Sequence, residues 1–143
     1  MELALSEGYA IVGICLIRLG RIVPVGLPRW FPCLASENAA HRIAVVCDGQ
    51  SAVFIPRRDT SSRLNHLVGG RLFPGEHGLA IFEVYQENGA FRIAVQSKDN
   101  ETSIGVSGNI VDHWPEDSCF PDLETAFDFF REASLGYSVT CRP

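Results

Sequence analysis

Polar side chains that could do chemistry gather in two stretches of this chain, each beside residues typical of strands. The first stretch runs from Ser36 to Val45, and the second runs from Ile55 to His77. The candidate site residues among them are two carboxylates, two imidazoles and three guanidinium groups, from Glu37, Glu76, His41, His77, Arg57, Arg58 and Arg71. Carboxylates and imidazoles can move protons, and arginine holds anions through paired hydrogen bonds. We therefore expect a site for a small anion, with Glu76 and His77 as catalytic candidates.

His41 and Arg71 are the two ligand-binding candidates that we expect to meet at one cavity. His41 shares its strand parity with three apolar residues, Ile43, Val45 and Cys47, which predicts that it points inward. Arg71 follows two glycines that let the backbone turn tightly. Each residue also has a structural interpretation: His41 could be a buried histidine bonded to a carbonyl or to Glu37, and Arg71 could pair with Glu37 or Glu76.

Arg57 and Arg58 precede a predicted short helix. Asp59 or Thr60 can cap this helix, one face carries Leu64, Leu67 and Val68, and Gly69-Gly70 ends it. Free N–H groups and the helix dipole at such a start attract an anion, so both arginines are binding candidates. The alternative is that Asp59 only caps the helix and pairs with an arginine.

Two Asx-Gly pairs predict tight hairpins. Asp48-Gly49 separates strands at 42–47 and 51–55, and Asn88-Gly89 separates strands at 79–86 and 91–97. A third strand follows at 104–110, where apolar and polar residues alternate. We therefore expect a mainly antiparallel, strongly curved sheet.

Four further segments complete the expected α+β domain, which spans residues 1–143. The continuously apolar run from Tyr9 to Ile17 predicts a strand buried on both faces, and the proline-rich segment 24–32 predicts an ordered loop. A second amphipathic helix begins at Asp122, with an apolar face formed by Leu123, Ala126, Phe127 and Phe130. A last strand is expected at 137–141.

Composition limits the function classes. A net charge of −5 argues against nucleic acid as a partner, since phosphate binding needs clustered basic residues. The five cysteines show no CxxC or CxH spacing, so they predict buried apolar residues in a reducing compartment rather than disulfides or zinc. No apolar run is long enough to span a bilayer. We expect a cytoplasmic chain with no membrane partner, metal or cofactor.

The order of a polar strand start, a hairpin, an extended proline segment, a short helix and then Gly-Arg resembles the acetoacetate-decarboxylase-like superfamily, and more closely an uncharacterised bacterial branch of it. The resemblance implies a curved, barrel-like sheet around a small apolar cavity. In the decarboxylases, Gly-Arg-Glu leads into Phe-Pro-Lys-Lys, and one of those lysines forms an imine with the substrate. The matching segment here is Gly70 to His77, with Glu76 and His77 near the places of the lysines.

Compared with that family, this chain lacks the imine-forming lysine, and it is expected to be truncated at both ends. The only lysine, Lys98, lies in a polar turn. The leading hypothesis is a binding domain for a carboxylate or other small anion. One alternative is a lyase or isomerase in which Glu76 or His77 moves a proton without an imine. Another is a non-catalytic remnant whose sheet edges pair between the subunits of a homo-oligomer.

Overall fold

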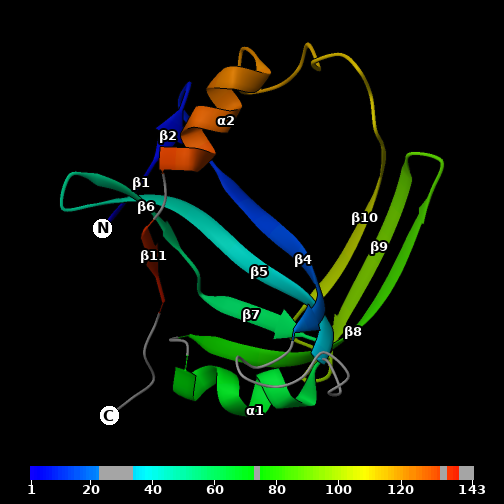
Figure 1. Ribbon diagram of the computed structural model, residues 1–143. Coiled ribbons are helices and arrows are strands. Elements are labelled where there is room, and N and C mark those ends of the chain that lie inside the picture. Colours follow the sequence, from blue (N-terminus) through cyan, green and yellow to red (C-terminus); the bar gives the residue numbers. More distant parts are fainter. Residues whose placement is uncertain (23–33, 73–74, 133–134, 139–143) are drawn as a thin grey trace.

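The protein is built around one strongly curved mixed sheet with two short helices (Figure 1). The computed structural model describes residues 1–22, 34–72, 75–132 and 135–138. Its strands are β1 (Glu2–Leu3), β2 (Leu5–Ser6), β3 (Tyr9–Ala10), β4 (Val12–Ile22), β5 (Leu34–Cys47), β6 (Gln50–Phe54), β7 (Arg57–Thr60), β8 (Glu76–Glu87), β9 (Ala90–Ser97), β10 (Ser103–Asn109) and β11 (Leu135–Tyr137). The helices are α1 (Arg63–Leu72) and α2 (Leu123–Glu132).

The strand order β10-β9-β8-β7-β5-β6-β11 makes β5 the centre of the sheet. Its other side pairs with β4 along most of its length and with β1 near its end. Most neighbours are antiparallel, as expected, but β7 with β8 and β6 with β11 are parallel pairs. In the described part of the chain, β4 and β10 each have a strand on one side only, so the sheet is mixed and not closed into a barrel.

Both predicted hairpins are confirmed. Asp48 and Gly49 have φ angles of 52° and 78°, and Asn88 and Gly89 have φ angles of 50° and 79°. These left-handed conformations form the tight turns whose twist matches that of the flanking strands. The three consecutive antiparallel strands β8, β9 and β10 also follow the prediction, as does α2, which begins after Asp122. Asp122 caps this helix by accepting a hydrogen bond from the Thr125 N–H at 2.7 Å.

The segment before the first helix differs from the prediction. Residues 57–60 form strand β7 between β5 and β8, so Asp59 and Thr60 are not helix caps. Ser62 is the cap instead, because its Oγ accepts a hydrogen bond from the Asn65 N–H at 3.2 Å. The helix also continues past Gly69-Gly70 to Leu72. The Gly69-Gly70 pair does not end the helix, contrary to the prediction. Gly69 is buried, and because it has no side chain this turn of the helix packs directly against His77.

The first strands also differ from the prediction. The apolar run at 9–17 divides into β3 and the start of β4, and it is not buried on both faces: Val12 is 67% exposed and Ile14 is 40% exposed. The reason is that β4 is an outer strand. By contrast, β5 starts at Leu34, well before the expected Arg42, because its polar beginning pairs with both β4 and β7.

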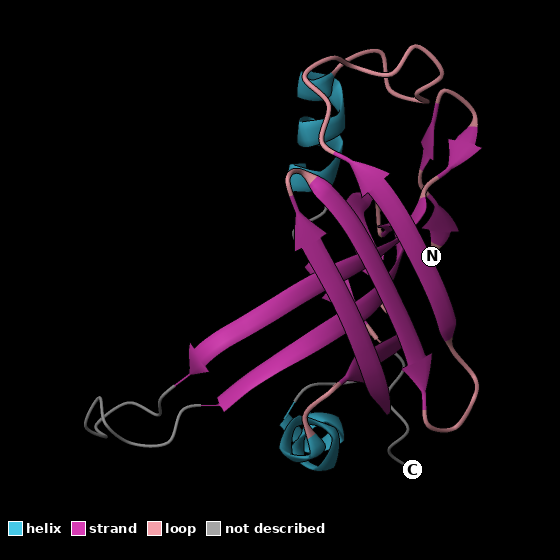
Figure 2. Ribbon diagram, turned by 90° about the vertical axis from the view of Figure 1, so that its right-hand side faces the viewer, coloured by secondary structure: helices cyan, strands magenta, loops and turns pink. Residues whose placement is uncertain are grey.

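The two faces of the curved sheet carry different layers. Figures 1 and 2 show α1 on the outer, convex side below β7 and β8, while α2 lies near the opposite end. Since paired residues point to the same face, the register places Ala40, Arg58 and His77 together on the convex side. It places Ala39, Asp59 and Gly78 on the concave side.

The remaining expectations are met only in part. Cys15, Cys47 and Cys119 are free but half-buried, not fully buried as expected. The last strand, β11, lies at Leu135–Tyr137, somewhat earlier than predicted, and residues 139–143 fall outside the described ones. The predicted proline-rich loop also lies outside them. Neither helix of the described chain is long and apolar enough to cross a membrane.

Candidate functional site

A mainly apolar cavity of about 600 Å³ lies against the convex face of the sheet, beneath α1. Strands β4, β5, β7 and β8 contribute wall residues, and α1 contributes Asn65 and Gly69. Its apolar lining comes from Ile17, Leu19, Ala39, Ala40 and Ile55. A cavity of this size fits a small organic molecule, and such sites combine an apolar wall with a few placed polar groups.

Most of the ionisable groups in the described cavity wall are basic. Arg42, Arg58 and His77 line the cavity from three different strands. Asp59 is the one acidic residue among the described lining residues, but both its carboxylate oxygens are bonded to side chains of the other face. Among the described lining residues, the wall therefore presents the positive charges of Arg42 and Arg58, and no carboxylate of these residues is directed into the cavity.

The two guanidinium groups differ in their contacts. Arg58 is half-buried and donates a hydrogen bond to Ser138 Oγ at 3.0 Å. Burial, and after it the charge of Arg42, lowers the pKa of Arg58. Arg42 is more exposed, and its side chain forms no hydrogen bond or ion pair with any residue that the structure describes. An anion between them would relieve the repulsion of two like charges.

His77 is oriented by the turn that precedes its strand. Its Nδ1 lies 3.0 Å from the carbonyl oxygen of Gly75, which can only accept, so Nδ1 carries a proton and donates it. In the neutral ring, Nε2 is then free to accept a proton. Burial is the main cause that lowers the pKa of His77, and the charges of Arg58 and His66 lower it further. The ring is therefore held in its neutral form near pH 7.

Two local features fix the roof of the cavity. A side chain on Gly69 would overlap the His77 ring, so only glycine lets α1 approach this closely. His66, one turn earlier in α1, donates to the His77 carbonyl at 2.6 Å. Asn65, near the start of α1, and Asn38, in β5, both donate hydrogen bonds to Ser36 Oγ, at 3.1 and 3.0 Å. These bonds tie α1 to β5 and β8.

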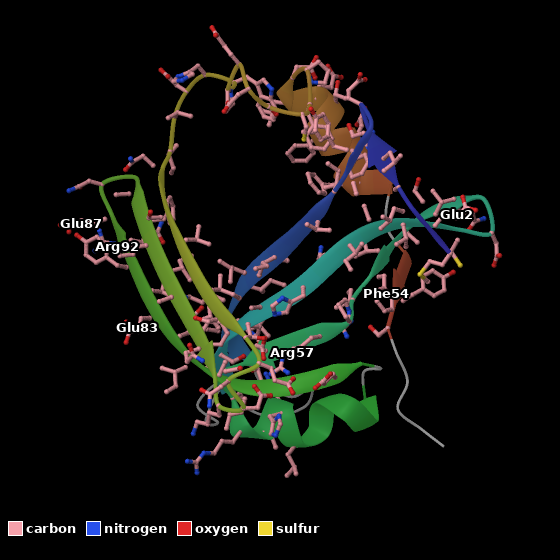
Figure 3. All side chains as sticks on the ribbon, turned by 180° about the vertical axis from the view of Figure 1, so that it is seen from behind. Glu2, Phe54, Arg57, Glu83, Glu87 and Arg92 are labelled. Atoms are coloured by element: carbon pink, nitrogen blue, oxygen red, sulfur yellow. The ribbon has the colours of Figure 1, made fainter. Side chains whose placement is uncertain are left out.

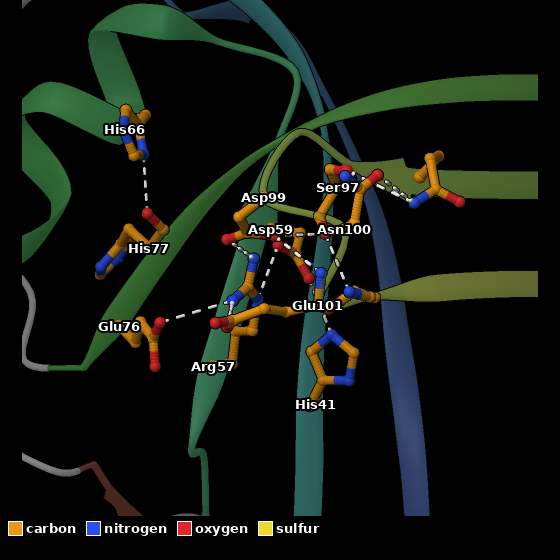
Figure 4. Close-up of polar contacts among 12 residues, drawn as sticks. His41, Arg57, Asp59, His66, Glu76, His77, Ser97, Asp99, Asn100 and Glu101 are labelled. Carbon is orange, nitrogen blue, oxygen red and sulfur yellow. Dashed lines mark hydrogen bonds and ion pairs between the residues drawn. The ribbon is translucent and has the colours of Figure 1, made fainter.

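A second charged cluster lies on the concave face, centred on Arg57 (Figure 4). Arg57 Nε donates to Asp59 at 2.9 Å, and its two terminal nitrogens contact Asp99 and Glu101 at 2.6 Å each. Glu76 is a fourth, more distant partner at 3.4 Å. The pKa of Arg57 is raised: burial lowers it, but the hydrogen bonds to Asp99 and Asp59 outweigh that effect. The positive charge of Arg57 is thus satisfied within the chain.

The Arg57 cluster also anchors the turn between β9 and β10. Ser97 Oγ donates to Asp99 at 2.5 Å, and the N–H of Glu101 donates to the same carboxylate at 3.1 Å. The hydrogen bond from Ser97, followed by that from Arg57, lowers the pKa of Asp99 far below its usual range. The fully buried Asp59 also holds His41, whose Nε2 lies 2.9 Å from its second oxygen.

The structure separates the predicted site residues into two groups. Arg58 and His77 line the cavity, whereas Arg57, Glu76 and His41 belong to the concave face. Glu76 and His77 are adjacent in β8 and therefore point to opposite faces. His41 does point inward from β5, but toward Asp59. Neither Arg57 nor Arg58 stands at a helix start, contrary to the prediction.

Two other predicted residues are not placed in the cavity by the described contacts. Glu37 accepts a hydrogen bond from Arg18 at 2.5 Å and is not among the lining residues. The backbone of Arg71 lies in the last turn of α1, and its side chain lies outside the described residues. The expected meeting of His41 and Arg71 therefore stays untested.

Sequence reasoning missed Arg42, and a signal for it existed. Arg42 stands between Ala40 and Ala44 in the same parity of β5, and both alanines are buried. A charged residue in an apolar row indicates either a paired ion or a binding site. No comparable signal existed for Asp99 and Glu101, which reach Arg57 only through the folding of the β9–β10 turn.

No group of three or more His, Cys, Asp or Glu side chains in the described ranges is arranged to hold a metal ion. No protein-family model matches the chain, and no similar protein was found among the curated proteins or the solved structures. The function is therefore argued from the geometry of the cavity.

Proposed function

We propose that this chain binds a small molecule that has a carboxylate or another compact anionic group at one end and an apolar part at the other. The observation that supports this proposal is the pairing of an apolar cavity with the basic groups of Arg42, Arg58 and His77. The ligand's anion lies between the two guanidinium groups, and its apolar part contacts Ile17, Leu19 and Ile55. The cavity expected around His41 and Arg71 stays a prediction, because the side chain of Arg71 lies outside the described residues.

A series of straight-chain ligands tests both halves of the site. Acetate, butyrate and hexanoate carry the same carboxylate but bury increasing apolar surface, at about 0.8 kcal/mol per CH₂ group. Calorimetric titration should therefore show affinity rising by about fourfold for each added CH₂. Hexanol has the apolar chain without the charge and should bind much more weakly than hexanoate. Equal binding of the two would contradict an anion site.

Substitutions of the two arginines give a sharper test. Arg58→Leu should weaken hexanoate binding by about ten- to a hundredfold, because a charge-assisted contact of about 1.5–3 kcal/mol is lost. Arg42→Leu should have a smaller effect, since Arg42 is more exposed and its charge is better screened. The matched control is Arg92→Leu, which removes an exposed guanidinium on the outer face of β9 (Figure 3). Unchanged affinity in Arg58→Leu would remove the proposal's main support.

A second candidate function is proton transfer by His77 to or from a ligand held by the arginines. It is favoured by the hydrogen bond from Nδ1 to Gly75, which leaves Nε2 of the neutral ring as a base in the cavity wall. A base next to a bound 2-oxo acid could remove a proton from the carbon beside its carbonyl group. Glu76 would take no direct part, because it points to the other face.

Deuterium exchange distinguishes catalysis from binding alone. If His77 is a base, 2-oxobutyrate in D₂O should exchange its C3 protons faster with the protein than without it, as measured by proton NMR. His77→Gln should abolish the acceleration, whereas Glu76→Gln should leave it intact. Binding of 2-oxobutyrate without faster exchange would leave the chain a binding domain.

The likeness to the acetoacetate-decarboxylase-like superfamily is also a proposal. A curved, mainly antiparallel sheet with a cavity and a short helix after an extended segment supports it. Lys98 is exposed and is not one of the cavity's described lining residues, which fits binding without an imine. Borohydride reduction with acetoacetate should therefore trap no stoichiometric adduct, and trapping at Lys98 with turnover would overturn this part.

A further inference from the structure

Two asparagines in the cavity wall have side-chain oxygens without a partner in the described chain. Asn38 belongs to β5 and Asn65 to the first turn of α1. The amide nitrogen of Asn38 donates to the carbonyl oxygens of Ile17 and Ser36 and to Ser36 Oγ. The amide nitrogen of Asn65 also donates to Ser36 Oγ. All the described hydrogen bonds of both side chains are thus made by Nδ2, and neither Oδ1 accepts one.

Backbone acceptors fix the orientation of the Asn38 amide. The carbonyl oxygens of Ile17 and Ser36 lie 3.3 and 3.2 Å from one terminal atom of this side chain. A carbonyl oxygen can only accept, so that atom is the nitrogen and the other one is Oδ1. Every fully buried side-chain oxygen or nitrogen in the described chain has a partner, so Oδ1 of the half-buried Asn38 is accessible to solvent. An accessible acceptor in a cavity wall can receive a hydrogen bond from a ligand.

Thr60 places a hydroxyl group beside Asn38. The two residues are partners in the register of β5 and β7, and paired residues point to the same face. Thr60 also lines the cavity, and its Oγ1 accepts a hydrogen bond from the Ser62 N–H at 3.2 Å. No acceptor among the described residues takes the proton of this hydroxyl. An acceptor from Asn38 and a donor from Thr60 together match a hydroxyl group, which both donates and accepts.

This polar pair, Asn38 and Thr60, lies apart from the basic groups on the convex face. Thr60 is two residues from Arg58 along β7, or about 7 Å between their Cα atoms. Asn38 is four residues from Arg42 along β5, or about 13 Å. The wall residue between these two is Ala40. A ligand whose anion lies between the arginines can therefore reach the polar pair only through a chain of several apolar carbons.

We propose that the ligand is a hydroxy acid, in which an apolar chain separates the anion from a hydroxyl group that contacts Asn38 and Thr60. This inference rests on the proposed function and adds the group at the far end of the ligand. The hydroxyl donates to Asn38 Oδ1 and accepts from Thr60 Oγ1, and Asn65 Oδ1 offers a further acceptor from α1. A plain fatty acid would instead cover these polar groups with apolar carbon, which costs free energy.

Calorimetric titration of the unaltered chain with paired ligands tests the inference. In each pair the chain length is the same, and only the hydroxy acid can donate a hydrogen bond. At six carbons, at eight, or at both, the hydroxy acid should bind about two- to tenfold more tightly. The pairs are 6-hydroxyhexanoate with 6-methoxyhexanoate and 8-hydroxyoctanoate with 8-methoxyoctanoate. Equal affinities within both pairs would overturn the inference.

A shorter pair tests the position of the polar groups. 4-Hydroxybutyrate is too short to reach from the arginines to the polar pair, so it should show no such preference over 4-methoxybutyrate. A preference as large as that of the longer acids would mean that the hydroxyl contacts another group, and it would also overturn the inference.

Substitutions assign the preference to the polar pair. Asn38→Leu replaces the amide by an apolar side chain of similar size and should bring the affinity ratio of hydroxy to methoxy acid close to one. Thr60→Val keeps the shape of threonine without its hydroxyl and should also lower the ratio. The matched control is Asn109→Leu, at an exposed residue of β10 that is not among the described lining residues. An unchanged ratio in Asn38→Leu would contradict the inference.

Hexanoate separates a failure of this inference from a failure of the proposed function. If hexanoate binds and depends on Arg58, while the longer pairs show no preference for the hydroxyl, only the inference is overturned. If neither hexanoate nor any hydroxy acid binds, the proposed function fails and the inference fails with it.

Discussion

The two charged regions of this protein lie on opposite faces of one sheet, and they differ in the groups that surround their basic residues. On the concave face, one guanidinium from Arg57 is surrounded by four carboxylates of the same chain. On the convex face, Arg42, Arg58 and His77 line an apolar cavity. Neighbouring residues of β7, Arg57 and Arg58, belong to the two different regions because alternate side chains of a strand point to opposite faces.

The comparison sets a charged residue whose ion pairs stabilise the fold beside basic residues that, under the proposed function, contact a ligand. A buried ion is tolerated when partners of opposite charge satisfy it, as Asp59 satisfies Arg57. Under the proposed function, the like charges of Arg42 and Arg58 raise the energy of the empty cavity, and a bound anion lowers it. The Arg57 cluster is therefore expected to control stability, and the cavity is expected to control binding.

The largest expected effect is the loss of stability when Arg57 is replaced by Met. The substitution leaves the fully buried Asp59 carboxylate without its cation, which should lower the free energy of unfolding by about 3–5 kcal/mol. Urea denaturation followed by circular dichroism measures the change. Arg92→Met, on the exposed outer face, should change stability by no more than about 0.5 kcal/mol. If Arg57→Met also costs no more than that, the cluster is not a structural centre.

A smaller loss is expected when Gly78 is replaced by Ala. A Cβ at this position would overlap both Asp59 Oδ1 and the Arg57 guanidinium, so the buried ion pair must shift. Overpacking of this kind costs about 1–3 kcal/mol. Gly105→Ala in β10 is the matched control, because an added Cβ there meets nothing within 4 Å. Similar denaturation midpoints for the two variants would show that the Arg57–Asp59 ion pair can shift with little loss of stability.

The smallest expected effect is a difference in how the two regions respond to pH. Burial lowers the folded-state pKa of His77, so the unfolded chain binds a proton more readily. Stability linked to His77 is therefore complete above the ordinary histidine pKa of about 6.5 and is lost as pH falls below it. Stability linked to Asp99 is complete above about pH 3.9 and is lost only in stronger acid, because its folded pKa is also lowered.

Urea denaturation between pH 4 and 8 separates these two contributions. His77→Gln should remove part of the stability change between pH 7 and 5, and Asp99→Asn should leave that range unaltered. His113→Gln, which changes an exposed histidine, is the control for the first substitution. Saturating hexanoate should reduce the acid sensitivity of the wild type, since a bound anion raises the pKa of His77. A profile that His77→Gln leaves unchanged would contradict the position of His77 in the site.

Local patterns predicted the parts of the fold that depend on a few neighbouring residues. The Asp48-Gly49 and Asn88-Gly89 turns were predicted because positive φ angles follow from residue type, and the helix start at Asp122 was predicted from the amphipathic pattern that follows it. The segment 57–60 was misassigned because a parallel pair such as β7 and β8 joins residues across a whole helix. No local pattern reports such a pairing.

For the candidate site, the sequence indicated the residue types but not their grouping. It placed Arg58 and His77 in one site, but it also placed His41, Glu76 and Arg57 there. Glu76 and His77 point to opposite faces because both lie in β8. The sequence alone predicted that this strand begins at Leu79, after both residues.

The sequence by itself determined the hairpins, the second helix, the acidic net charge and the absence of an imine-forming lysine in the expected motif, because each depends on composition or short spacing. Only the tertiary structure decided which arginine meets four carboxylates and which lines a cavity. Arg57 and Arg58 are adjacent and chemically identical, so nothing in the sequence distinguishes them. Their environments differ because the β9–β10 turn brings Asp99 and Glu101 to one face of the sheet, while α1 covers the other.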